Sequence, residues 1–175
     1  NYSDSVKKTY NITPAQVTVK ADNKSKVYGA TDPALTATVT GLVNNESQSL
    51  IIYTIARQSG EAAGTYTITP SGAATQGNYS VKFETGTFTI TSKPIVDPDD
   101  PTKTMVTNDP SNVTYNGLDQ KWEPVVKDGN TVLVKDTDYT VTYSADTKNV
   151  GQVTVTITGI NNYSDSVKKT YNITP

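Results

Sequence analysis

Apolar residues alternate with polar ones, most often threonine, in many short segments of this chain. The pattern is clear in residues 17–21 and 35–40, where valine, leucine and alanine occupy every second position, and in residues 153–158, where threonine separates valine and isoleucine. Side chains of a β-strand point alternately to opposite faces, so this spacing predicts strands with one apolar face and one wet face. The alternation therefore predicts an all-β chain.

Turn-forming residues separate these segments. A series of such pairs recurs about every 8 to 12 residues, among them Asp32-Pro33, Asn44-Asn45, Gly77-Asn78 and Asn161-Asn162. Short strands joined by frequent turns are typical of a β-sandwich. We therefore predict two antiparallel Ig-like β-sandwich domains in tandem, with a β-grasp-like variant as the alternative for the first domain. One short helical turn is expected near residues 45–50, with Asn45 as its cap.

An identical segment of fourteen residues occurs twice, at residues 1–14 and at residues 162–175, with the sequence NYSDSVKKTYNITP. An exact match of this length indicates recent duplication of a unit of about the size of this chain. A weaker similarity relates the two halves, because Tyr28 precedes Gly64 by the same number of residues by which Tyr115 precedes Gly151. The chain is thus expected to contain two diverged copies of one domain type.

These repeats predict four parts of the chain. Residues 15–92 and 103–175 form one β domain each, and residues 1–14 are the closing strand of a preceding repeat, expected either to extend the strand at Gln16 or to be disordered. Residues 93–102 contain three prolines, which cannot donate a backbone hydrogen bond. We therefore predict that they form an extended, semi-rigid linker without regular pairing.

Composition excludes several classes of function. The net charge of −2 and the pI near 5.1 do not fit a protein that binds nucleic acid through a basic face. The chain contains no histidine and no cysteine, which removes histidine-dependent triads, thiolate chemistry and disulfides. No apolar run approaches the length of a membrane span. We predict that the chain is not an enzyme, that it carries no cofactor and that this segment does not insert into a membrane.

Two groups of carboxylates are candidate sites. The linker carries Asp97, Asp99 and Asp100, which suit a hard cation such as Ca²⁺, although aspartate next to proline also keeps a spacer soluble and extended. The second group is a candidate for hydrolysis by a carboxylate pair and contains Asp136, Asp138 and Asp146. A surface hairpin explains this second group better, and we predict no metal site and no catalytic residues.

Three further features are weighed in the same way. Trp122 can stack on a sugar ring if it is exposed, but a core or edge position is expected.

Five glycines beside tyrosines are expected at turns that need a positive φ: Gly29, Gly64, Gly77, Gly117 and Gly151. An isopeptide bond between a lysine and an asparagine or aspartate requires a buried lysine, its partner and an acidic catalyst in one core. The sequence assigns no ligand-binding residue.

Several motifs are shared with a known family. Residues 26–33 read Lys-Val-Tyr-Gly-Ala-Thr-Asp-Pro, residues 63–68 read Ala-Gly-Thr-Tyr-Thr-Ile and residues 77–79 read Gly-Asn-Tyr. With these motifs, residues 15–91 resemble the MBG family of bacterial extracellular domains, which occurs in tandem on adhesins. The second half resembles bacterial Ig-like surface repeats through the motifs at residues 115–117, 138–143, 149–151 and 159–163.

Together the two halves resemble a repeat of the mucus-adhesion proteins of lactobacilli. The resemblance implies an extracellular protein, anchored to a Gram-positive cell wall, that contacts host mucin or another extracellular glycoprotein and neighbouring repeats of its own chain. The alternative is a passive structural stalk repeat that projects a distal binding domain. The resemblance supplies no binding residues for either function.

Overall fold

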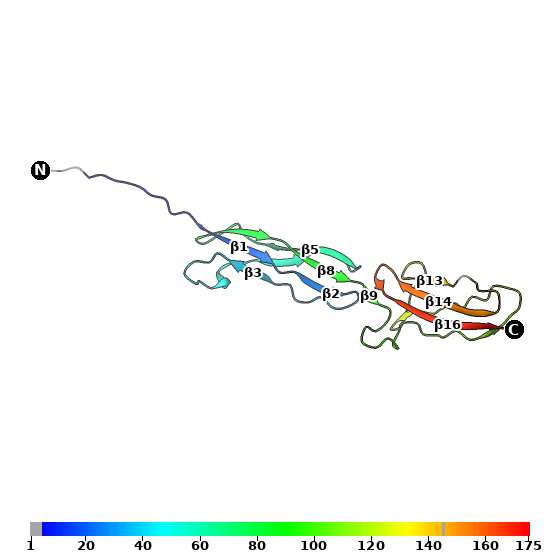
Figure 1. The fold of residues 1–175 in the computed structure, drawn as a ribbon. Helices are drawn as coiled ribbons and strands as arrows, with labels where there is room; N and C mark the ends of the chain where they lie inside the picture. The colour runs from blue at the N-terminus through cyan, green and yellow to red at the C-terminus, as the bar shows by residue number, and fades with distance from the viewer. Residues whose placement is uncertain (1–4, 145) are drawn as a thin grey trace. The chain divides into compact units, whose positions relative to one another are not determined.

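The computed structural model describes residues 5–144 and 146–175, and the described residues form strands together with a single 3-10 turn (Figure 1). The all-β prediction is confirmed. The strands of the first half are β1 (Ala15–Ala21), β2 (Lys24–Val27), β3 (Ala37–Thr40), β4 (Thr54–Arg57), β5 (Gly64–Ser71), β6 (Thr75–Gln76), β7 (Tyr79–Glu84) and β8 (Gly86–Thr91). Those of the second half are β9 (Lys93–Pro94), β10 (Val113–Thr114), β11 (Lys127–Asp128), β12 (Thr131–Val132), β13 (Tyr139–Tyr143), β14 (Gly151–Gly159), β15 (Tyr163–Ser164) and β16 (Ser166–Thr174).

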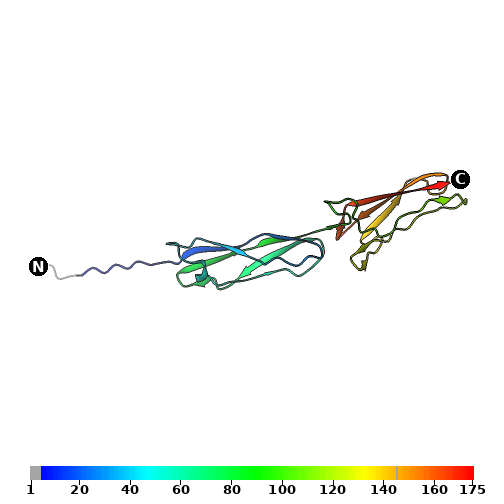
Figure 2. The ribbon, with the colours of Figure 1, turned by 90° about the horizontal axis from the view of Figure 1, so that it is seen from below.

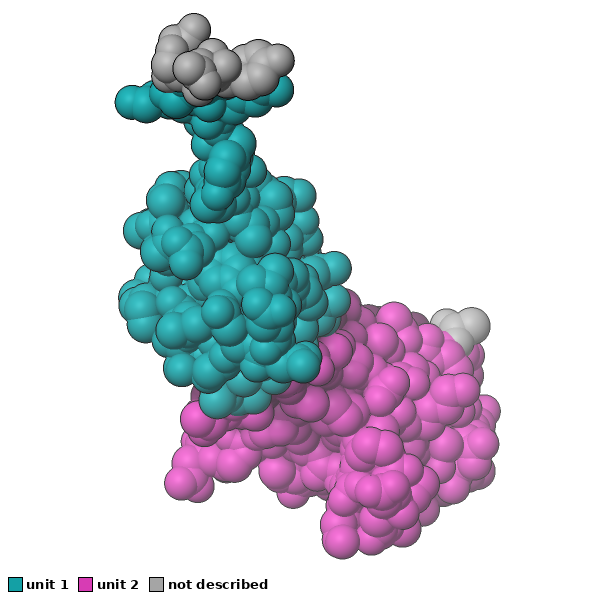
Figure 3. Space-filling view, turned by 90° about the vertical axis from the view of Figure 1, so that its left-hand side faces the viewer, with its two compact units in different colours: residues 1–24, 33–60, 65–89 teal, residues 25–32, 61–64, 90–175 magenta. Residues whose placement is uncertain are grey.

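The chain divides into two compact units, coloured separately in Figure 3. Unit 1 contains the described residues among 1–24, 33–60 and 65–89. Unit 2 contains residues 25–32 and 61–64 and the described residues among 90–175. Two short segments of the first half of the sequence thus belong to the packing of unit 2.

Unit 1 is built around a four-stranded sheet with the order β3-β1-β7-β6. Alternate residues of β1 face its core, because Val17, Val19 and Ala21 are at most 2% exposed while Gln16 and Lys20 are exposed. The buried side chains of this core are Val17, Val19, Val39, Ile51, Tyr79 and Val81. A second four-stranded sheet has the order β2-β8-β5-β4, and its residues Ile68 and Phe88 are completely buried.

A continuous extended run connects these two sheets. β7 ends at Glu84 and β8 begins at Gly86, so only Thr85 separates a strand of one sheet from a strand of the other. Glycine is required at this crossing, since a Cβ on Gly86 would lie 2.6 Å from the carbonyl oxygen of Ala21. Figure 1 shows β8 pointing in the same direction as β1.

Unit 2 contains a four-stranded sheet with the order β10-β16-β14-β13 and the short pairs β11-β12 and β9-β15. β14 is the centre of the ladder, pairing with β13 on one side and with β16 on the other. The core of this unit consists of Ile95, Val106, Val126, Leu133, Tyr139, Val153, Val155, Ile157, Tyr163, Val167, Tyr171 and Ile173.

Some of the strand pairs are parallel, which corrects the prediction of wholly antiparallel domains. β1 pairs with β7 in parallel, as does β10 with β16 and β9 with β15. The period-two pattern records which face a side chain occupies, and it is the same for both strand directions. The pattern therefore does not predict whether two paired strands run parallel or antiparallel.

The prediction that residues 93–102 form an unpaired linker is wrong for residues 93–95. β9 pairs with β15, and Ile95 is completely buried in the core of unit 2. The hydrogen bonds come from residues on either side of Pro94, because the Lys93 N–H donates to Asn162 O and the Ile95 N–H donates to Ser164 O, each at 2.9 Å. A proline at the centre of so short a parallel pair therefore costs no hydrogen bond.

The first copy of the duplicated segment forms no strand over residues 5–14, and residues 1–4 lie outside the described residues. Of the two alternatives predicted for it, extension of the neighbouring strand is wrong, since β1 begins at Ala15. Figures 1 and 2 show residues 5–14 as a single trace with no strand beside it. Val6, Tyr10 and Ile12 are 83%, 85% and 86% exposed.

The expected helical turn exists with a different cap. The 3-10 turn η1 (Gln48–Leu50) has Ser47 as its N-cap, whose hydroxyl accepts a hydrogen bond from the Ser49 N–H at 3.2 Å. Asn45 does not cap it, because its φ of 56° is left-handed, whereas an N-cap residue takes an extended conformation.

Candidate functional site

The motif at residues 26–33 builds a charged triad. The chain reverses after β2, where the Ala30 N–H donates to Val27 O at 3.0 Å and Gly29 takes a φ of 79°. This reversal returns Asp32 to Lys26, and the two side chains form an ion pair of 2.7 Å. The Lys26 ammonium also donates to the carboxylate of Glu61. We call Lys26, Asp32 and Glu61 the lysine triad.

Burial differs sharply within the lysine triad. The Lys26 side chain is only 5% exposed, while the side chains of Asp32 and Glu61 are 37% and 66% exposed. Hydrogen bonds to Asp32 and then to Glu61 raise the pKa of Lys26 above its usual value. The triad is therefore a lysine held in its charged form by two carboxylates that face water.

A second group of side chains lies close to the same motif. The rings of Tyr28 and Tyr163 meet edge to face, with centroids 5.5 Å apart and an interplanar angle of 73°. Asn162 accepts through its side-chain oxygen from the Ala63 N–H at 2.8 Å. The Tyr163 hydroxyl lies 3.4 Å from Asp128, which also pairs with Lys93 at 2.6 Å.

This tyrosine cluster, formed by Tyr28, Lys93, Asp128, Asn162 and Tyr163, ties the short segments 25–32 and 61–64 into unit 2. Burial, followed by the charge of Asp128, raises the pKa of Tyr163 to about 12. The cluster therefore contains a neutral phenol and an ion pair, and it offers no nucleophile activated for catalysis.

The lysine triad places a buried lysine beside two carboxylates, but both carboxylates face water rather than lying in one core, and the electrostatics oppose an isopeptide bond. Condensation needs an uncharged amine and a protonated carboxyl group, and it releases one water. We therefore expect the intact mass of the chain, measured by mass spectrometry, to equal the mass calculated from its sequence. A loss of one water that disappears in Lys26→Arg would contradict this expectation.

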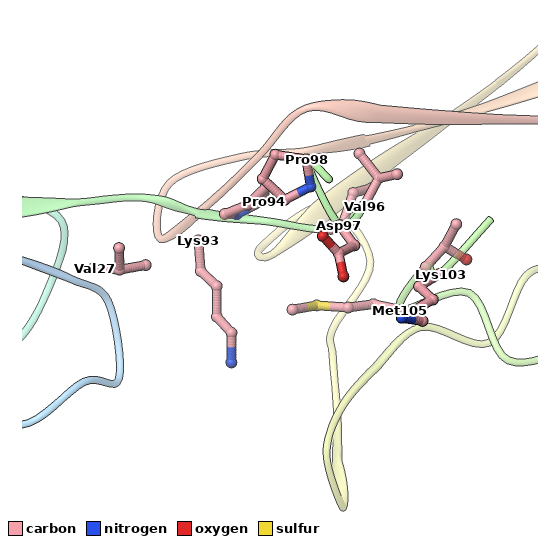
Figure 4. Close-up of a pocket in the computed structure, with 10 residues that line it drawn as sticks. Val27, Lys93, Pro94, Val96, Asp97, Pro98, Lys103 and Met105 are labelled. Atoms are coloured by element: carbon pink, nitrogen blue, oxygen red, sulfur yellow. The ribbon is translucent and has the colours of Figure 1, made fainter. Parts of the chain in front are cut away.

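Two of the surface depressions formed by the described residues lie in unit 2. The first has a volume of about 460 Å³ and is mainly apolar, with Val27, Lys93 and Met105 among the residues that border it in Figure 4. Its lining contains one carboxylate, Asp97, and no aromatic ring. Lys93, Lys103 and Thr104 add hydrogen-bonding groups at its border, but most of its surface is apolar.

The second depression is polar and has a volume of about 510 Å³. Its lining residues are Asp119, Lys121, Val141, Thr142, Tyr143, Ser144, Asp146 and Thr147. The Lys121 ammonium lies 5.6 Å from the centre of the Tyr143 ring. The Tyr143 hydroxyl donates to Trp122 O at 2.7 Å, and burial together with Glu123 raises its pKa to about 12. We call this site the Tyr143 depression.

Trp122 lies next to the Tyr143 depression but does not line it. Its side chain is partly buried and packs against the core of unit 2, which confirms the expected core or edge position. The sequence missed Tyr143 and Lys121 as a site. The only available signal was an aromatic residue on a predicted strand, and several other strands of the chain carry one as well.

The carboxylates of Asp97 and Asp100 stabilise local turns. Asp97 accepts from the Asp99 N–H at 2.9 Å, and Asp100 accepts from the Thr102 N–H at 3.1 Å and from the Thr102 hydroxyl at 2.6 Å. The hydroxyl of Thr102 is the main cause that lowers the pKa of Asp100. In the part of the chain that the structure describes, no group of three or more acidic side chains is arranged to hold a metal ion.

The second group of carboxylates is likewise divided between local turns. Asp138 accepts from the Val134 N–H at 2.8 Å, and Asp136 occupies the same turn with a φ of 64°. Asp146 accepts from the N–H groups of Lys148 and Asn149 at 2.8 and 2.9 Å. These bonds support the surface-hairpin interpretation and give the side chains of Asp138 and Asp146 structural roles, while Asp136 contributes its backbone conformation to the turn.

The fold and these sites define an all-β module with a motif-built charged triad and no helix, among the described residues, long and apolar enough to cross a membrane. The model of the MBG domain family, YGX type, matches residues 17–89, which confirms the resemblance predicted for the first half and indicates a repeat family of surface proteins. The matched segment includes Tyr28 and Gly29 at the turn of the lysine triad. No curated protein matches the chain.

Proposed function

We propose that the chain is a repeat module of a Gram-positive cell-surface adhesin, held on the cell wall, and that it contributes to attachment to mucin glycoproteins. The observation that carries this proposal is the Tyr143 depression, which combines an aromatic edge, hydroxyl groups, a carboxylate and a cation on one open surface. The proposal assigns no reaction to the chain.

The groups of the Tyr143 depression suit a hydroxyl-rich ligand. Asp119 uses one carboxylate oxygen to accept from the Thr147 hydroxyl at 3.2 Å, and Thr142 is exposed on β13, the last strand of its sheet. Lys121 adds a positive charge that favours acidic sugars. An open site of this kind gives weak contacts, and tandem copies multiply them through avidity.

Binding of the chain to immobilised purified mucin, measured by surface plasmon resonance, tests the proposal. We expect measurable binding that Lys121→Glu combined with Thr142→Ile weakens about tenfold, because this pair inverts the positive charge and fills part of the depression with an apolar side chain. Lys127→Glu on β11 is the matched control and should bind as the unaltered chain does, since Lys127 is exposed outside the depression. Absence of binding by the unaltered chain overturns the adhesion proposal.

The second candidate function is a passive structural stalk repeat. It is favoured by the duplicated segment, since exact duplication adds length to a protein without requiring a ligand. The hydrogen bonding of the interior also favours it. Among the described residues, every buried side-chain nitrogen or oxygen has a hydrogen-bond partner. Equal and negligible mucin binding by the unaltered chain and both variants supports this second function.

A further inference from the structure

One sequence occupies two different environments in this molecule. In the second copy of the duplicated segment, Val167, Tyr171 and Ile173 are 7%, 3% and 1% exposed. The corresponding residues of the first copy are the exposed Val6, Tyr10 and Ile12 described above. The first copy therefore carries the apolar face of a sheet strand with nothing packed on it.

The place of the second copy is well defined. β16 pairs with β14 through eight residue pairs, from Gly151 with Ile173 to Thr158 with Ser166, and its last residues also pair with β10. The Tyr171 hydroxyl donates to Gln120 O. A one-residue shift would turn the buried side chains to solvent, so only a strand with this exact alternation fits the position.

We propose that residues 1–14 are an alternative closing strand, able to occupy the position of β15 and β16 in a second copy of this chain. The donated strand is identical in sequence to the strand that it replaces, so every side-chain contact and backbone hydrogen bond of the position is reproduced. Thr174 and Pro175 are exposed at the end of β16, which lets the donor chain continue from its own Pro14 into solvent.

The chain's own β16, the resident strand, normally occupies this position because it is covalently linked to β14 in the same chain. Its effective concentration near its own sheet is of the order of millimolar, well above the concentration of a second copy in dilute solution. Exchange becomes visible when the resident strand is disabled. Donation then joins copies through a heterologous contact, so the fraction and size of joined assemblies grow with concentration.

The variant Tyr171→Asp/Ile173→Asp tests the proposal by placing two charges on the buried face of β16 while leaving residues 1–14 intact. Light scattering coupled to size exclusion, over a hundredfold range of concentration, is expected to show assemblies whose mass increases with concentration. Trp122, the only tryptophan, packs against the core of unit 2 and reports its folding. Its emission should stay native-like in these assemblies.

The matched control carries the same two substitutions in the first copy as well. Adding Tyr10→Asp/Ile12→Asp to the variant should abolish assembly and give a monomer with exposed Trp122. The two N-terminal substitutions alone should leave a monomer with native emission. A synthetic peptide with the sequence of residues 1–14 should restore native emission to the doubly substituted monomer, while a peptide carrying the same two aspartates should not.

Three outcomes overturn the proposal. One is a β16 variant that stays monomeric at every concentration, whether its unit 2 is folded or unfolded. Another is assembly that persists unchanged after Tyr10 and Ile12 are replaced, which would indicate unspecific aggregation. The third is a peptide that fails to restore Trp122 emission at millimolar concentration.

Discussion

Ile173→Ala should lower the free energy of unfolding of unit 2 by about 2–5 kcal/mol, because it empties a completely enclosed position on β16. Ile12→Ala changes the same residue in the same local sequence and should alter stability by less than about 0.5 kcal/mol, because Ile12 is exposed. Urea unfolding followed by Trp122 emission measures the value for Ile173→Ala, and hydrogen exchange of the β1 amides measures the value for Ile12→Ala, because residue 12 belongs to unit 1.

The comparison isolates burial from every local property of the sequence. Strand propensity, neighbouring residues and the chemical change are identical in the two variants, so their difference is the packing term alone. Similar effects of Ile173→Ala and Ile12→Ala would contradict the placement of β16 in the core, and a large effect of Ile12→Ala would contradict the exposure of residues 5–14.

Phe88→Ala should be the most damaging single substitution in unit 1, with an expected loss of about 3–5 kcal/mol. The Phe88 side chain is completely buried, and the guanidinium of Arg57 lies 4.8 Å from the centre of its ring. The substitution therefore removes a large apolar side chain and a cation–π contact at once.

Hydrogen exchange of the β5 and β8 amides measures the effect of Phe88→Ala, since the only tryptophan lies in unit 2. Thr87→Ala is the control on the exposed face of the same strand and should cost no more than about 1 kcal/mol. Unchanged protection of β8 in Phe88→Ala would show that the ring does not hold the two faces of unit 1 together.

The sequence pattern located the strands and their faces well. The alternation in residues 17–21 and 153–158 correctly identified Val19 and Val155 as completely buried. Success at these positions has a simple cause, since a half-buried strand needs an apolar residue at every second place whatever its partner is.

Three features lay outside that pattern. The parallel pairing of β1 with β7 depends on residues far apart in the chain. The pairing at Pro94 uses the amides of its neighbours, so the proline gave a misleading signal. The contact of Tyr28 with Tyr163 joins two motifs that the sequence interpreted separately as turns. Local sequence carries no information on such partners.

The Tyr143 depression was equally hidden, because its residues come from separate segments around 119–121 and 141–147. Lys121 and Tyr143 are ordinary residues of a loop and a strand when taken alone. The lysine triad was closer to prediction, since Lys26 and Asp32 belong to one motif, but Glu61 joins them only through the fold.

The parallel pairing of β1 with β7 sets how unit 1 carries mechanical load. Tension that enters at Ala15 and leaves at the end of β8 pulls β1 one way and the continuous run of β7 and β8 the other way. The six paired positions of β1 and β7 are then loaded in shear at the same time, rather than opened one after another. A module of this design resists traction along the chain, because all six positions must give way at once.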